Sequence, residues 1–106
     1  MTPIKRHWSI VQELGCCVSR QPAVIHHVIG ADLTRMTGGK SASQKANDWL
    51  VIPLAPEYHT GKLGIHQLGV ATWESQFGRQ VDFLKRVCEQ TGVDVFEKAG
   101  LEYPEW

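Results

Sequence analysis

Two segments, Ile25-His26-His27-Val28-Ile29-Gly30 and Leu50-Val51-Ile52-Pro53-Leu54-Ala55-Pro56-Glu57-Tyr58-His59, decide how this chain folds. Each contains an apolar, β-branched run of the kind that forms strands. The first run ends in paired histidines. In the second, Pro56 suits the first turn of a helix that reaches His59. The pattern predicts two strands followed by a short helix, with histidines at a strand end and on the helix.

Length and composition restrict the class of protein. The chain has 106 residues, 42% of them hydrophobic, which favours a single domain over residues 1–106. No run approaches the roughly 18 to 20 apolar residues of a membrane span, and Met1-Thr2-Pro3-Ile4-Lys5-Arg6 lacks the apolar core of a signal peptide. We therefore expect a cytoplasmic protein without a membrane partner. Three cysteines, two of them adjacent, make a poor disulfide framework, so we expect reduced thiols.

The charge is neutral overall but uneven along the chain. Residues 1–48 contain six Lys or Arg and three acidic residues, a balance of +3, so the remainder carries −3. Zero net charge argues against a purely electrostatic DNA binder, and any phosphate-facing surface should lie in the first half. Arg35, Lys40 and Lys45 are candidate DNA contacts, with a merely solvated basic loop as the alternative.

Apolar spacing and turn residues predict the other elements. A short strand is expected at 17–18, and a long polar loop at 30–46, where small and polar residues prevail. The tail at 103–106 either is disordered or packs back through its aromatic rings. Helical spacing predicts helices over 6–14, 72–77, 79–90 and 93–99.

The histidines carry the candidate chemistry. Because neighbouring strand residues point to opposite faces, His26 and His27 should have different roles, one reaching a metal ion and the other a water molecule. His59 can ligate a divalent ion from the start of the helix. In a continuous helix His66 would lie about 10 Å further along the axis, so its participation requires a turn at 60–64, where Gly61 and Gly64 can break the helix. His7, next to Trp8, is interpreted as structural or surface-exposed.

Several ordered segments resemble a known family. Ile-His-His-Val-Ile-Gly, Lys-Ala-Asn-Asp-Trp-Leu-Val-Ile-Pro-Leu, Tyr-His, Gly-Ile-His and Trp-Glu-Ser-Gln-Phe-Gly resemble the HNH nucleases of phages and prophages. Within that superfamily the chain is most similar to the Ref-like, RecA-dependent recombination enhancement nucleases. The resemblance covers roughly residues 6 to 100. It implies an α+β fold with a small ββα-metal (HNH, or His-Me finger) core at about residues 16–68 and flanking helices, the C-terminal ones at about 72–100.

The resemblance also implies roles for individual residues. His26, His59 and His66 would bind the ion, and His27 would be the general base. The asparagine of the HNH name orients that base, and the simplest spacing puts Leu50 there. We prefer Asp48, which matches the Ala-x-Asp found before this strand in many phage relatives, with Asn47 as the alternative. Many relatives hold a structural zinc through a Cys-x-x-Cys pair and a cysteine just after the Pro-Leu, whereas this chain has Cys16 with Ser19 at the first place and Ala55 at the later one.

These observations predict a metal-dependent DNA endonuclease that acts in phage or prophage recombination or repair. One divalent ion, Mg²⁺ or Mn²⁺, would support activity, and Zn²⁺ or Ni²⁺ can also occupy a histidine-rich site. DNA is the expected partner, with a RecA filament as a second partner that the resemblance implies. The alternative is a catalytically inactive HNH-like DNA-binding or recombination accessory module. A purely structural phage protein, with neither metal nor DNA affinity, is a third reading.

Overall fold

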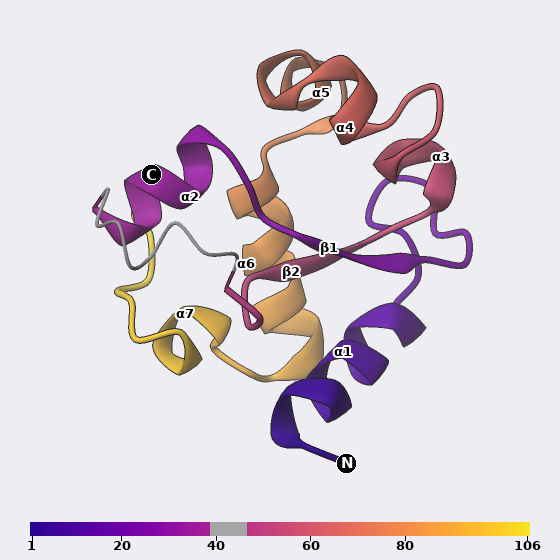
Figure 1. Cartoon of the computed structure of the whole chain (residues 1–106). Helices are drawn as coiled ribbons and strands as arrows, with labels where there is room; N and C mark the ends of the chain where they lie inside the picture. Colours follow the sequence, from indigo (N-terminus) through magenta and orange to yellow (C-terminus); the bar gives the residue numbers. More distant parts are fainter. Residues whose placement is uncertain (39–46) are drawn as a thin grey trace.

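A two-stranded antiparallel sheet lies at the centre of the structure, a computed structural model that describes residues 1–38 and 47–106 (Figure 1). Strand β1 (Val24–His27) pairs with β2 (Val51–Leu54), and the register places His26 opposite Ile52 and His27 opposite Val51. The predicted α+β class is confirmed. The helices around the sheet are α1 (Pro3–Glu13), α2 (Ala31–Thr37), α3 (Pro56–His59), α4 (Ile65–Leu68), α5 (Val70–Phe77), α6 (Gln80–Thr91) and α7 (Val95–Lys98).

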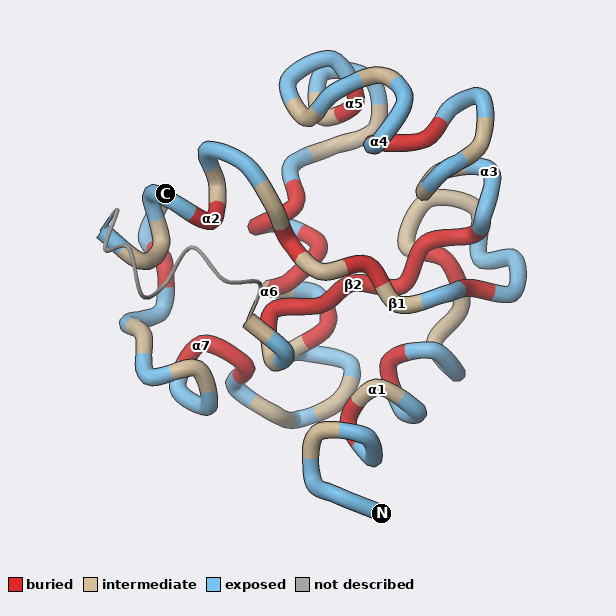
Figure 2. Tube along the Cα trace, viewed as in Figure 1, coloured by how far each residue is buried: buried red, intermediate tan, exposed pale blue. Residues whose placement is uncertain are grey.

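Strand β2 forms the middle of the core. Residues Val51–Leu54 are all buried, and Figure 2 shows further buried positions on α6, which contacts this strand. Helices α1 and α6 pack against β2, while α3 contacts both strands. A strand covered on both faces has no solvent side to carry polar residues, which explains the unbroken apolar run Leu50–Ala55. The predicted strand in this segment is confirmed.

The predicted helices form with shifted ends. Helix α1 begins earlier than expected because the Thr2 hydroxyl accepts a hydrogen bond from the Lys5 N–H and Pro3 occupies the first turn. Helix α6 ends at Gly92, whose φ of 74° is in the left-handed region that favours glycine. At the C-terminus the tail packs back, with the Tyr103 ring 5.2 Å from that of Phe96. Across residues 1–38 and 47–106, no helix combines the length and apolarity needed to cross a bilayer.

Part of the predicted 30–46 loop is wrong, because residues 31–37 form helix α2. Its polar residues suit a helix: the Thr34 and Thr37 hydroxyls donate to the carbonyls of Gly30 and Leu33, four residues earlier in each case. Leu33 supplies the buried contact. The rest of that prediction, residues 39–46, lies outside the described residues.

The short strand predicted at Cys17–Val18 is also wrong, because the segment is a turn. The Cys16 Sγ accepts hydrogen bonds from the N–H groups of Val18 and Ser19, so the chain wraps around the sulfur instead of extending. Arg20 completes the turn with a φ of 64°. One sheet-like contact remains, since the Cys17 N–H donates to the carbonyl of Pro53 in β2.

Candidate metal centre

Three imidazoles from separate elements converge on one point. His26 comes from β1, His59 from the end of α3 and His66 from α4. Each offers a ring nitrogen, and these three atoms all lie within 4.8 Å of one another. The Nε2 atoms of His59 and His66 are 3.0 Å apart. The structure thus brings together the three residues predicted as metal ligands.

The turn between α3 and α4 makes this convergence possible. Helix α3 ends at His59, and the chain reverses through residues 60–64, as the participation of His66 required. Gly64 passes so close to α3 that an added Cβ would lie 2.5 Å from the His59 carbonyl oxygen. Any larger residue would push α4 away from α3. Gly64 therefore lets His66 fold back onto His59.

One pair of ligand atoms has the spacing expected around a bound divalent ion. Nitrogens that each lie about 2.1 Å from one ion are roughly 3.0 to 3.4 Å apart, the range into which the His59–His66 separation falls. His26 is 1% exposed, and its Nδ1 atom is buried without a hydrogen-bond partner. A buried lone pair without a partner is costly in a metal-free protein. Three imidazoles are also a usual donor set for transition metals.

Burial keeps two of the three imidazoles neutral. It is the largest of the effects that together lower the pKa of His26 to about 4; the Gln80 hydrogen bond raises this pKa, and the nearby imidazoles of His59, His66 and His27 lower it. Burial, followed by the proximity of His66, also lowers the pKa of His59. A protonated imidazole cannot bind a cation, so these shifts keep the two rings competent as ligands at neutral pH.

His27 faces a different partner, as strand alternation predicts. Its Nε2 lies 3.0 Å from Asp48 Oδ1, with 31% of the His27 side chain and 57% of the Asp48 side chain exposed. Trp8 holds this pair from α1: its indole N–H donates to the Asp48 carbonyl at 2.8 Å, and its ring meets the His27 ring edge-on. Solvent, and hence a substrate, can reach the pair, in contrast to the buried ring of His26.

Asn47, Asp48 and Leu50 are the three candidates for orienting His27, and their contacts differ. Asn47 turns away, since its Oδ1 accepts from the Trp49 N–H in its own loop. Leu50 is fully buried, and its carbonyl accepts from the Val28 N–H. Of the three positions weighed from the sequence, Asp48 is the one whose side chain reaches His27.

Sequence reasoning missed a buried polar group behind the cluster. Gln80, at the start of α6, is fully buried and bonds to His26, to the Ile29 backbone and to Asp32. The backbone N–H of Gln80 donates to the Glu74 carboxyl. Burial and the hydrogen bond with Asp32 raise the pKa of this carboxyl to about 7. The one local signal was a glutamine at an otherwise core-facing helix position. Its partner His26 is 54 residues away.

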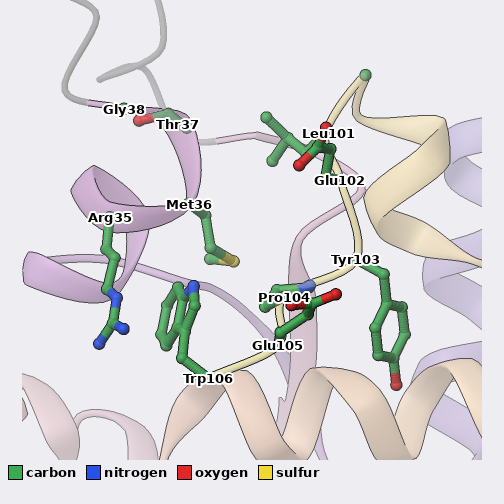
Figure 3. Close-up of a pocket in the computed structure, with 11 residues that line it drawn as sticks. Arg35, Met36, Thr37, Gly38, Leu101, Glu102, Tyr103, Pro104, Glu105 and Trp106 are labelled. Atoms are coloured by element: carbon green, nitrogen blue, oxygen red, sulfur yellow. The ribbon is translucent and has the colours of Figure 1, made fainter.

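The predicted DNA contacts are placed only in part. Arg35 lies on α2 with its guanidinium 4.0 Å above the Trp106 ring, beside a surface cavity of about 610 Å³ between α2 and the C-terminal segment (Figure 3). Lys40 and Lys45 lie outside the described residues.

His7, expected to be structural or exposed, is 3% exposed and packs against the Trp49 ring. Trp73 is fully buried, whereas Trp8 and Trp49 are only half-buried.

The fold and the site together define a small α+β domain with a three-histidine cluster where a two-stranded sheet meets two short helices. The chain belongs to the DUF968 family, described as proteins of unknown function, whose family model matches residues 4–93. The matched segment contains the imidazole cluster, the His27–Asp48 pair and Gln80. No curated protein and no solved structure matched the chain.

Proposed function

We propose that this protein is a metal-dependent DNA endonuclease with a ββα-metal core, in which β1, β2 and α3 are the two strands and the helix. The observation that carries the proposal is that His26 and His27, adjacent on β1, have different partners. His26 turns inward to two further imidazoles, while His27 turns to an exposed carboxylate. A cation site with a separate base that stays off the cation is one arrangement that metal-assisted hydrolysis uses.

The ligand set would consist of His26, His59 and His66. A divalent ion held there supplies positive charge that stabilises the phosphoryl and leaving oxygens of a phosphodiester. Mg²⁺ or Mn²⁺ is proposed for activity, and Zn²⁺ or Ni²⁺ as alternative occupants.

His27 would be the general base, and its hydrogen bond to Asp48 determines which nitrogen acts. An ionised carboxylate only accepts hydrogen bonds, so the His27 Nε2 donates and its Nδ1 keeps a lone pair. Asp48 therefore holds the ring in one tautomer and stabilises the imidazolium that forms when Nδ1 takes a proton from water. In-line attack by that water would leave a 5′-phosphate and a 3′-hydroxyl.

DNA is the proposed substrate because the segments that resemble HNH nucleases contain both the three-histidine cluster and the His27–Asp48 pair. A RecA filament as activating partner is proposed on the same resemblance. Zero net charge agrees with such help, since few phosphate contacts give weak binding to naked DNA.

Cleavage of supercoiled plasmid and of single-stranded circular DNA, with Mg²⁺ or Mn²⁺ and with or without RecA filaments, tests the proposal. His27→Ala should abolish cleavage but leave Zn²⁺ affinity, measured by calorimetry, within a few-fold of wild type. His66→Ala should lose both. Gln67→Ala, an exposed neighbour on α4, is the matched control and should lose neither. Cleavage by His27→Ala at the wild-type rate would remove His27 from its role.

The same experiment addresses the inactive accessory module. Nothing in the described site favours it, because both the ligand cluster and the base–carboxylate pair are complete. Metal binding and DNA binding without cleavage under every condition would nevertheless establish that module and overturn the nuclease.

A further inference from the structure

Gln80 makes every hydrogen bond that its side-chain amide can make. Its Oε1 lies 3.0 Å from the His26 Nε2 and accepts from the Ile29 N–H at 3.2 Å. Its amide nitrogen donates to the Ile29 carbonyl at 3.0 Å and to Asp32 Oδ2 at 2.8 Å. All of this takes place at a residue that is fully buried.

The Ile29 backbone fixes which way this amide points. A backbone N–H only donates and a carbonyl only accepts, so the oxygen of Gln80 must face the Ile29 N–H and the nitrogen must face the Ile29 carbonyl. The Asp32 carboxylate reinforces the choice by accepting from the same nitrogen. A flipped amide would face like groups at all three contacts.

This orientation decides the state of His26. Because Gln80 presents an oxygen, the His26 Nε2 must carry the hydrogen, and in a neutral ring the Nδ1 then carries the lone pair. The Nδ1 is also the buried atom of His26 without a hydrogen-bond partner. The nitrogen that carries the lone pair is therefore also the one without a hydrogen-bond partner, as a metal ligand would be.

We propose that Gln80 is a positioning residue that fixes His26 as an Nδ1 ligand. This inference rests on the proposed function only in taking His26 as a metal ligand. Gln80 orients the ring and sets its tautomer before any ion arrives, and Asp32 and the Ile29 backbone hold Gln80. The start of α6 thus becomes part of the metal site, although it contributes no ligand.

The tautomer is measured first, in the metal-free wild-type protein. Nitrogen-15 NMR correlations of the His26 ring, recorded with EDTA at pH 7, should place the hydrogen on Nε2. A hydrogen on Nδ1, or an equal mixture of the two forms, would overturn the proposal. This experiment requires neither a bound ion nor cleavage, so its result is separate from that of the proposed function.

Three variants then test the role of Gln80. Gln80→Met keeps the length but removes the acceptor; it should give a mixed tautomer and weaken Zn²⁺ binding by about ten- to hundred-fold in calorimetry. Gln80→Glu keeps an acceptor for His26 but loses the donor to Asp32 and the Ile29 carbonyl, so it should retain the wild-type tautomer at a lower stability. Gln90→Met, at an exposed glutamine of the same helix, is the matched control and should change neither quantity.

A merely structural role predicts a different pattern. Gln80→Met and Gln80→Glu would both lower stability, yet neither would change the tautomer, and that result would overturn the proposal. If Gln80→Met does not fold, the wild-type tautomer still decides the question. Wild-type protein that binds no Zn²⁺ would overturn both the metal site and the ligand half of this inference.

Discussion

Acid should destabilise the metal-free protein through His26. This ring is 1% exposed, and burial lowers its pKa from 6.5 to about 4. Between these two values the unfolded chain binds a proton that the folded protein does not. The contribution of His26 to stability is therefore complete above about pH 6.5 and is lost progressively as the pH falls to about 4. At roughly 1.4 kcal/mol per pH unit, this loss amounts to about 3 kcal/mol.

Urea denaturation with EDTA, repeated from pH 8 to pH 4.5, measures this effect. Aspartates and glutamates titrate in the same range, so the test is the difference between wild type and His26→Gln, which lacks the titrating ring. The variant should have the flatter profile. Gln67→Ala changes an exposed residue that does not titrate and should keep the wild-type slope. Equal slopes in wild type and His26→Gln would refute the claim that His26 is buried as a neutral ring.

Three further predictions concern single residues, namely Gly64, Trp8 and Trp73. Gly64→Ala places a Cβ 2.5 Å from the His59 carbonyl oxygen, so Zn²⁺ affinity should fall at least ten-fold in calorimetry; unchanged affinity would show that α4 does not need the close approach. Trp8→Phe keeps a ring against His27 but removes the 2.8 Å bond to the Asp48 carbonyl, worth about 1 kcal/mol, so cleavage should slow about five-fold with metal affinity unchanged. An equal loss of metal affinity would show that the His27–Asp48 pair and the metal ligands do not act separately. Trp73→Ala empties a fully buried site and should lower the free energy of unfolding by about 3 to 5 kcal/mol in urea titrations; a loss below about 1 kcal/mol would contradict the burial.

The sequence predicted those parts of the molecule that depend on local pattern. Both strands, the helix after Pro56 and the different surroundings of His26 and His27 follow from apolar runs, a proline and strand alternation. His66 could be placed only conditionally, because its position depends on how closely the chain returns at Gly64.

Other features depend on contacts between distant parts of the chain, which local pattern does not encode. Trp8 meets Asp48 across 40 residues, and Gln80 meets His26 across 54. Neither residue type suggests such a partner by itself. Helix α2 was missed for another reason: its threonines are poor helix formers in general, but here their hydroxyls bond to the preceding turn.

The central claim is that His26, His59 and His66 bind one cation while His27 stays free of it. A crystal structure of the zinc-soaked protein, with anomalous diffraction measured at the zinc edge, tests this most directly. The account predicts one strong anomalous peak about 2.0 to 2.1 Å from the His26 Nδ1 and from one nitrogen each of His59 and His66, with His27 still bonded to Asp48. A peak bound by His27, or no peak among the three imidazoles, would contradict it.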